Sequence, residues 1–458
     1  MPLPPVRQVA LDTPADRDRL LDALRGFSLI AVVLGHVAMA MVAWTPQGDP
    51  IVGNLLASSQ PLQAITWILQ VIPLFFLAGG AANAKSWRRA RERGVTYSAW
   101  VWGRVERLYR PVLAYLAFLA VVGTIATVWI GPASGPILAL ACQMLWFLGI
   151  YVMTTMLLPA MLHLHERGRL RAFIVGVPLV AVLNLGVTFW GWAVPISFGN
   201  FLLAWLLVQQ LGFFWDEPTS KGAWIAMLLI CLPTSIALVA FGPWPMSLVG
   251  IPGEPVSNMA PPSLVLLLHA GTMCAAVYLA RDPLTKWLHR GAPWTAAVAM
   301  SMTAMTVYLW HVPAMVAAVI LLHATGANPP TAISNGIPAP TSLAAYGAWW
   351  LLFLLVFTVF LIVVVLLTWP IEHARLPLWD GQRRIALPRQ APLGMAQALT
   401  AIGIVIMGCA TLVLSIIGFA GFPLAWIPWY GLDLNAAVAS VAILVGAWLV
   451  RAAAGRQL

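Results

Sequence analysis

The sequence predicts an all-α fold, a polytopic bundle of transmembrane helices with about twelve spans and both termini in the cytoplasm. Three observations lead to this prediction. Hydrophobic residues make up 61% of the 458 residues and charged residues only 9%, a composition that a soluble protein of this size could not keep in water. Apolar runs of about 18 residues or more recur along the chain. The Lys and Arg residues all fall on one side of the predicted membrane.

The predicted spans follow one another through mostly short connections. The sixth is short, and the ninth is long enough to be tilted, kinked or broken. With the N-terminus inside, all 25 Lys and Arg residues lie in cytoplasmic connections, at cytoplasmic helix ends or in the terminal segments. The net charge of +10 therefore faces anionic lipid, and it does not indicate nucleic-acid binding. The spans are 24–44, 62–82, 108–130, 137–161, 172–190, 199–215, 223–241, 263–280, 294–322, 344–369, 396–421 and 435–450.

This topology divides the chain into four parts. We expect a cytoplasmic N-terminal segment (1–20), a membrane core (21–375), a cytoplasmic loop (376–395) and additional C-terminal spans (396–458). The four cysteines lie in apolar runs without metal-type spacing, so we expect packing residues and no metal site. The sequence leaves the oligomeric state open. The histidines of the cytoplasmic connections are expected to be solvated; they are His163, His165, His289 and His373.

The first cluster of ionisable residues lies at the first span. Asp22 and Arg25 are three residues apart and can pair on one helix face, either as a membrane-edge ion pair or as part of a site. His36 follows Arg25 by eleven residues, about three turns, so both side chains share a face roughly 16 Å apart along the axis, with His36 near mid-bilayer. An ionisable residue at that depth is costly, so His36 is a functional candidate; the alternative is a histidine hydrogen-bonded within helix packing.

The second cluster is a run of arginines at the start of the third span. Arg104, Arg107 and Arg110 are spaced by three residues, and we expect them to share a helix face. They are either membrane-surface anchors or a clamp for phosphates, which guanidinium groups bind through forked, always-charged donors.

The third cluster lies in the middle of the long ninth span. Tyr308 and His311 share a face, and Pro313 removes a backbone donor and tends to kink the helix. A second intramembrane histidine indicates a polar cavity; the alternative is an isolated packing histidine.

Taken together, these clusters resemble the acyltransferase 3 family of integral membrane acyltransferases. Arg25 and His36 match its R-x10-H signature, RVER at 104–107 matches its R-x-x-R motif, and FFLAGG at 75–80 is similar to its FFxLSG segment, with Ala78 in place of the usual serine. WFL at 146–148 and the stretch around Tyr308 and His311 are similar to later landmarks. The family core usually has about ten spans, so the last two here would be an addition.

The resemblance implies transfer of an acyl group, such as acetyl, from cytoplasmic acyl-coenzyme A to a hydroxyl of a carbohydrate or sugar-containing lipid, in a bacterial plasma membrane. His36, with an ordinary imidazole pKa of about 6.5, would act as general base. The arginine triad would hold the donor's phosphates, and Asp22, Arg25, Tyr308 and His311 would complete the site. Acyl-coenzyme A would be a substrate, and no permanently bound cofactor is expected.

Two other classes of function remain open from the sequence. Twelve spans with both termini inside, and intramembrane His, Tyr and Pro residues, also suit a transporter or exporter of a small molecule. The two halves of the chain show no obvious internal repeat, which counts against that class. A non-catalytic scaffold would need neither His36 nor the arginines.

Overall fold

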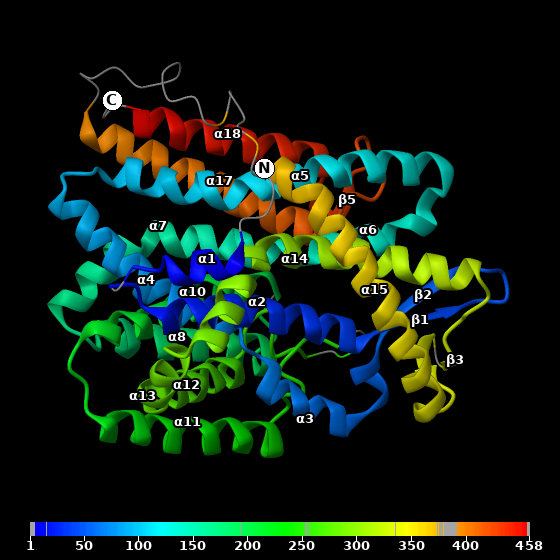
Figure 1. The fold of residues 1–458 in the computed structure, drawn as a ribbon, viewed down its shortest axis with the longest axis horizontal. Helices are drawn as coiled ribbons and strands as arrows, with labels where there is room; N and C mark the ends of the chain where they lie inside the picture. The colour runs from blue at the N-terminus through cyan, green and yellow to red at the C-terminus, as the bar shows by residue number, and fades with distance from the viewer. Residues whose placement is uncertain are drawn as a thin grey trace.

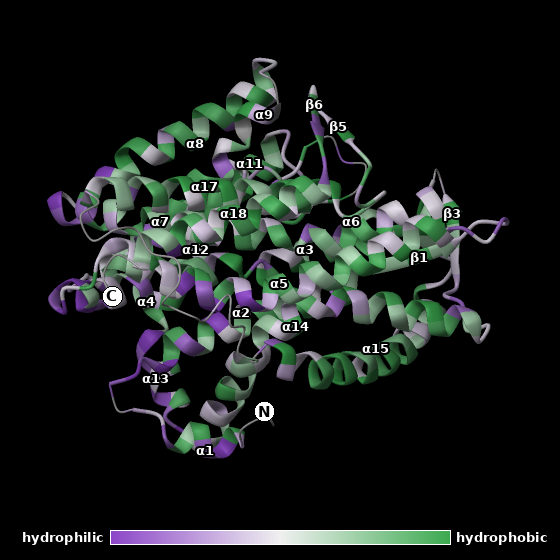
Figure 2. Cartoon of the chain, turned by 90° about the horizontal axis from the view of Figure 1, so that it is seen from above, coloured by the Kyte–Doolittle hydropathy of each residue, from purple (hydrophilic) through white to green (hydrophobic). Residues whose placement is uncertain are grey.

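The computed structural model describes residues 5–455 except 15, 193, 252–253, 255, 335, 373, 375–378 and 380–391. It confirms the predicted class: within these residues, ten helical segments are long and apolar enough to cross a membrane, and the only sheets are two-stranded. The long helices run roughly along one direction and form a bundle (Figure 1). Figure 2 shows hydrophilic residues gathered around α1, α4 and α13, whereas α8 and α15 are largely hydrophobic along their length.

The elements of the membrane-length segments have the following bounds. They are α2 (Arg19–Met39), α3 and α4 (Gln60–Leu69, Ile72–Glu92), α5 (Tyr97–Trp129), η2, α6 and α7 (Gly131–Ser134, Gly135–Gln143, Leu145–Arg167), α8 (Arg171–Phe189), α11 (Lys221–Phe241), α14 (Gly291–Ala324), α15 (Leu343–Glu372), α17 (Leu393–Ile417) and α18 (Ala436–Ala454).

The remaining elements are shorter. The helices are α1 (Val6–Leu11), η1 (Leu55–Ser58), α9 (Val194–Ser197), α10 (Gly199–Leu211), η3 (Gly212–Asp216), α12 (Leu264–Leu279) and α13 (Arg281–Leu288). The strands form three antiparallel hairpins, β1–β2 (Ala40–Trp44, Pro50–Asn54), β3–β4 (Thr331–Ser334, Ile337–Pro340) and β5–β6 (Ile427–Trp429, Leu432–Leu434).

Every predicted span contains a helix, but two of these helices are short. The sixth predicted span is α10, of 13 residues, followed by the single 3₁₀ turn η3. The eighth is α12, of 16 residues, after which the chain bends by 62° into α13. A straight helix needs about 20 residues to cross a bilayer, so the total of twelve spans stays a prediction.

Two predicted spans differ in detail from the structure. The first helix ends at Met39, because the chain turns there into the β1–β2 hairpin and does not continue as helix to residue 44. The ninth span, in contrast, is a single helix of 34 residues in spite of Pro313.

Side-chain caps and prolines explain several helix starts. Asp18 caps α2 by accepting hydrogen bonds from the backbone N–H groups of Leu20 and Leu21, each at 3.1 Å. The α3 and α4 helices each have a proline in the first turn, where no intrahelical donor is lost. A side chain of Thr, Ser or Asn caps α5, α11, α12 and α18 in the same way.

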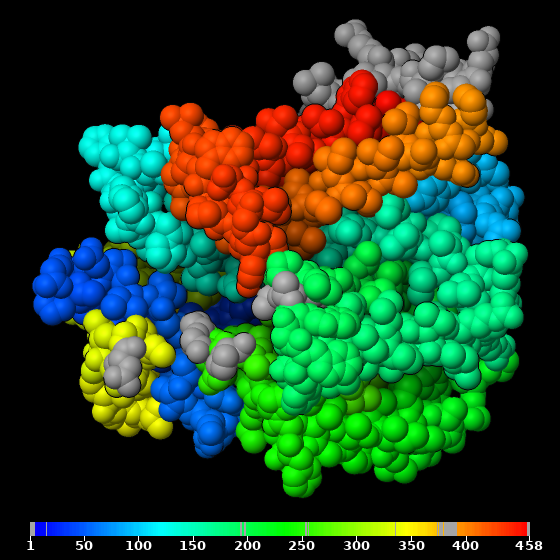
Figure 3. Space-filling view, turned by 180° about the vertical axis from the view of Figure 1, so that it is seen from behind, coloured from blue at the N-terminus to red at the C-terminus, as the bar shows by residue number. Residues whose placement is uncertain are grey.

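The C-terminal pair α17 and α18 packs directly on the core and is not a separate body. It lies along one side of the bundle beside α5, as Figures 1 and 3 show from opposite sides. The hydroxyls of Tyr109 on α5 and Thr411 on α17 are hydrogen-bonded at 3.0 Å, both buried. Between the two helices a Cβ added to Gly403 would meet the carbonyl oxygen of Gly446 at 2.6 Å, so small residues permit the close crossing.

The FFLAGG segment has a packing role that its position in α4 explains. A Cβ added to Gly80 would lie 2.2 Å from the carbonyl oxygen of Gln209 on α10. The two helices therefore touch backbone to backbone at this point, and only glycine allows that approach. Phe76, four residues earlier, stacks on Trp205 of α10, with centroids 4.7 Å apart.

Candidate active site

A pair of histidines joins the first and third sequence clusters. His36 near the end of α2 and His311 on α14 are hydrogen-bonded, with 3.1 Å between Nδ1 of His36 and Nε2 of His311. Their ring planes differ by 8° and their centroids are 5.2 Å apart, so the rings lie nearly edge to edge in one plane. This arrangement aims the N–H of one ring at the lone pair of the other.

The hydrogen bonds around this pair indicate which nitrogen is free to accept a proton. Nδ1 of His311 lies 2.6 Å from the carbonyl oxygen of Tyr308, which can only accept, so Nδ1 carries the hydrogen. In a neutral ring Nε2 of His311 is then an acceptor, and Nδ1–H of His36 donates to it. We infer that His36 keeps the lone pair of Nε2, which is the atom a general base needs.

Tyr308 and a glutamate hold α14 beside this pair. The Tyr308 hydroxyl donates to the carbonyl oxygen of Met144 at 2.9 Å, so this side chain is committed to a structural bond between α14 and the junction of α6 and α7. Thr306, five residues before His311, and Trp310, directly before it, donate to the two carboxylate oxygens of Glu372, at 2.6 Å and 3.0 Å. Glu372 is only 4% exposed. Glu372 belongs to none of the three sequence clusters, although an acid at the C-terminal end of an apolar 30-residue helix is a signal for a functional residue.

The expected pair of Asp22 and Arg25 does not form. Asp22 is instead paired with Arg17 of the segment that precedes α2. The guanidinium carbon of Arg25 lies 5.8 Å from the centroid of the Phe75 ring on α4, and its Nε–H is buried without a hydrogen-bond partner. A three-residue spacing allows a pair on a helix, but Arg17 competes for the carboxylate from outside the helix, and Phe75 offers Arg25 its ring face.

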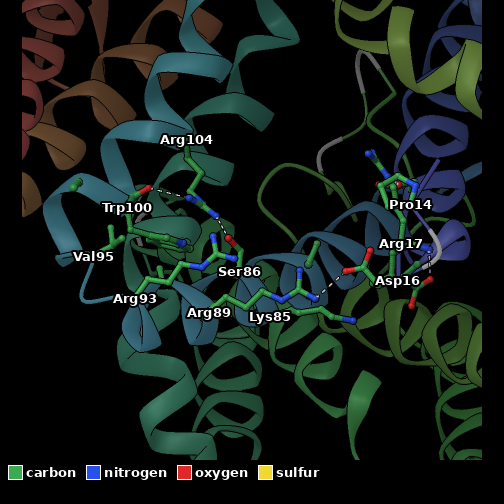
Figure 4. Close-up of a pocket in the computed structure, with 16 residues that line it drawn as sticks. Pro14, Asp16, Arg17, Lys85, Ser86, Arg89, Arg93, Val95, Trp100 and Arg104 are labelled. Atoms are coloured by element: carbon green, nitrogen blue, oxygen red, sulfur yellow. Dashed lines mark hydrogen bonds and ion pairs between the residues drawn. The ribbon is translucent and has the colours of Figure 1, made fainter. Parts of the chain in front are cut away.

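A cavity of about 590 Å³ opens beside the N-terminal end of α2. Its walls come from the segment before α2, from α4 and from the start of α5, and five of the side chains that line it are cationic: Arg17, Lys85, Arg89, Arg93 and Arg104. Three aspartates, Asp16, Asp18 and Asp22, also line it. Figure 4 shows the α4 and α5 cations along one side of the cavity and Pro14, Asp16 and Arg17 on the other. The sequence indicates no role for Lys85, Arg89 and Arg93 beyond the positive charge of the predicted cytoplasmic connections.

Arg104 is held rigidly in the wall of this cavity. Its guanidinium carbon lies 4.0 Å from the centroid of the Trp100 ring, and its N–H groups donate to the Trp100 carbonyl at 3.1 Å and to the Ser86 hydroxyl. Its Nε–H is buried without a partner. A guanidinium has five donors, so an oriented Arg104 keeps several for a ligand oxygen.

The other two arginines of the expected clamp do not line the cavity. Arg107 is exposed, and its Nε–H donates to the carbonyl of Gly103 at 2.9 Å. Arg110 donates to the carbonyl of Ala374 and lies 3.9 Å from a carboxylate oxygen of Glu106. Three residues turn a helix by about 300°, so each arginine is rotated by about 60° from the one before, and the run spreads over about 120°. Only Arg104 therefore faces the cavity.

One face of α2 connects the cationic cavity with the histidine pair. Asp18, Leu21 and Asp22 of that face line the cavity, and Arg25 follows one turn later. Ser28, Leu29 and Val32 then line a narrow crevice of about 10 Å³ together with Phe75, Phe147, Ile72 and Tyr308. His36 comes next on the same face. A crevice of this size holds about one water, so the route between the two sites is closed in this conformation.

His165 differs from the expectation of a solvated histidine, whereas His373 lies outside the described residues. His165 is 1% exposed; its Nε2 lies 3.0 Å from Glu217 and its Nδ1 lies 2.8 Å from the Gln210 amide nitrogen. Arg169 also contacts Glu217, at 3.1 Å. This cluster joins the end of α7 to α10 and to the end of η3. Among the described residues, no group of three or more His, Cys, Asp or Glu side chains could hold a metal ion.

Comparisons with known proteins agree with the sequence motifs. The family model described as an acyltransferase domain, acyltransferase 3, matches residues 18–369, which include the histidine pair and every helix that lines the cationic cavity. No curated protein and no solved structure matches the chain. The match covers well over half of the chain and ends before α17 and α18. The protein is an integral membrane acyltransferase and belongs to the acyltransferase 3 family.

Proposed function

We propose that the protein transfers an acyl group from cytoplasmic acyl-coenzyme A to a hydroxyl of a carbohydrate or a sugar-containing lipid acceptor, in the bacterial plasma membrane. The observation that carries this proposal is the face of α2 that leads from the cationic cavity past Arg25 to His36. Coenzyme A is a polyanion with a thioester at the end of a long arm. The cations of the cavity would bind its phosphates, and the arm would lie along the face of α2 that leads to His36.

In this proposal Nε2 of His36 takes the proton of the acceptor hydroxyl. The hydroxyl oxygen attacks the thioester carbonyl, the C–O bond forms and the C–S bond breaks. Coenzyme A leaves as a thiolate, which recovers the proton from His36. His311 acts as a positioning residue, because its hydrogen bond keeps the proton of His36 on Nδ1 and its lone pair on Nε2.

The closed crevice adds a requirement to this mechanism. Phe75, Phe147 and Tyr308 narrow the space beside Ser28 and Val32 to about 10 Å³, too little for the arm of the donor. Tyr308 is hydrogen-bonded to Met144, whereas Phe75 and Phe147 are held in the constriction by ring packing alone. We propose that donor binding opens the crevice by moving them.

The test is acyl transfer measured in purified protein with acetyl-coenzyme A and a carbohydrate hydroxyl acceptor. His36→Ala is expected to lower turnover by a factor on the order of 100–10,000 while coenzyme A still binds. His311→Gln offers an amide oxygen to Nδ1–H of His36 and should retain more activity than His311→Leu, which offers none.

His311→Ala separates the two histidines. If it abolishes transfer while His36→Ala does not, the base is on α14 and the assignment of roles is wrong. If neither substitution lowers transfer at equal protein abundance, the histidine pair has no part in the reaction and the proposal fails.

A further inference from the structure

The cationic cavity already contains an anion of the protein itself. A carboxylate oxygen of Asp16 lies 3.4 Å from a guanidinium nitrogen of Arg89, across the cavity from α4 (Figure 4). Arg17 is likewise paired with Asp22. Within the described residues no carboxylate lies within ion-pair distance of Lys85 or Arg93, the two neighbouring cations of the wall.

The backbone on either side of Asp16 is anchored to the bundle. On the N-terminal side, the indole N–H of Trp294 lies 2.9 Å from the Thr13 hydroxyl and 3.2 Å from the Ala10 carbonyl oxygen. On the C-terminal side, the indole N–H of Trp215 donates to Asp18 at 2.6 Å, and Asp18 caps α2. Between these two anchors the Asp16 side chain can leave Arg89 by rotation, without movement of the wall.

The pair of Asp16 and Arg89 contributes little to the fold. Its side chains are 69% and 51% exposed, and ion pairs at this exposure are worth little in stability. A phosphate ester carries up to two negative charges and three acceptor oxygens, whereas a carboxylate carries one charge and two oxygens. Both ligands use the same guanidinium donors, so phosphate and Asp16 cannot occupy Arg89 in the same way at once.

We propose that Asp16 is a built-in counter-ion of the donor cavity, which occupies Arg89 when the cavity is empty and must be displaced by a phosphate of the donor. This proposal rests on the proposed function, since it takes the donor to be a coenzyme A thioester. Asp16 thereby lowers the affinity for every phosphate-bearing ligand of the cavity and eases release of coenzyme A after transfer.

The experiment is calorimetric titration of the full-length protein in detergent with coenzyme A and, separately, with pantetheine, which has no phosphate. Asp16→Asn removes the charge and keeps the shape. It is expected to tighten coenzyme A binding by about two- to five-fold, which corresponds to the free energy of an exposed ion pair. The affinity for pantetheine should stay unchanged. In about 1 M salt, where the screening length falls to about 3 Å, the gain should disappear.

Asp12→Asn is the matched control. Asp12 accepts hydrogen bonds from Gln8 and does not line the cavity, so the same change of net charge there should leave binding unchanged. An equal gain in both variants would mean that only the overall charge matters and would overturn the proposal. If the parent protein binds coenzyme A and Asp16→Asn binds it no more tightly, the proposal about Asp16 is overturned and the proposed function is not. Absence of coenzyme A binding by the parent would overturn the proposed function as well.

Discussion

The backbone contact at Gly80 makes the sharpest prediction about stability. Replacement by alanine places a methyl group 2.2 Å from the carbonyl oxygen of Gln209 and 3.0 Å from its carbonyl carbon. Both atoms belong to backbone, so no side chain can rotate out of the way. The α4 and α10 helices must separate by about 1 Å to restore ordinary contact distances.

The expected cost combines two opposing terms. Overpacking of this kind usually costs about 1–3 kcal/mol, because neighbouring contacts are lost when helices move apart. Alanine in a helix interior stabilises the fold by about 0.5–1 kcal/mol relative to glycine. Gly80→Ala should therefore lower the free energy of unfolding by about 0–2.5 kcal/mol, and by about 1–3 kcal/mol relative to an unhindered Gly→Ala substitution in a helix. Because α4 also carries Lys85, Ser86 and Arg89, coenzyme A binding should weaken in the same variant.

Thermal unfolding in detergent, followed by circular dichroism, measures the first effect. Gly347→Ala is the matched control, since no atom lies within 4 Å of an added Cβ at that position in α15. The control should be neutral or slightly stabilising. If Gly80→Ala were as stable as Gly347→Ala and bound coenzyme A normally, the backbone contact between α4 and α10 would be refuted.

Two further predictions concern the cavity and the topology. In calorimetric titration, Arg104→Ala should weaken coenzyme A binding by about 1.5–3 kcal/mol, the value of a hydrogen bond to a charged group. Arg107→Ala should leave the affinity unchanged. Equal losses in the two variants would contradict the assignment of Arg104 alone, among the three arginines, to the cavity. In intact cells an impermeant maleimide should label Asp49→Cys in the β1–β2 turn and should reach Arg93→Cys, at the end of α4, only after the cells are opened. Labelling of Arg93→Cys in intact cells would reverse the predicted orientation.

The helical class of the protein and the location of its spans could be predicted from the sequence. Hydropathy and length are local properties of a segment, and a bilayer forces each apolar segment to satisfy its own backbone hydrogen bonds as helix. The alignment of Arg25 with His36 was predictable for the same reason, since helical geometry alone puts residues eleven apart on one face. The short α10 and the turn into β1 at Met39 depend on what the chain packs against, and hydropathy does not record that.

The partners within the site could not be predicted in this way. Asp22 pairs with Arg17, although the helical spacing favoured Arg25, because an arginine outside the helix reaches the same carboxylate. Arg107 and Arg110 turn away from the cavity because a spacing of three drifts around the helix by about 60° at each step. Glu372 had no motif around it, and its importance appears only when α15 brings it to Thr306 and Trp310.

The sequence by itself determined that this is a membrane-embedded helical protein with the motifs of an acyltransferase, because composition, span length and motif order are written along the chain. Only the tertiary structure decided that His36 meets His311, 275 residues away, and that the segment before α2 faces the cations of α4 across one cavity. Such contacts come from how helices pack, and packing depends on side-chain shape and close backbone approach between segments that are distant in the chain.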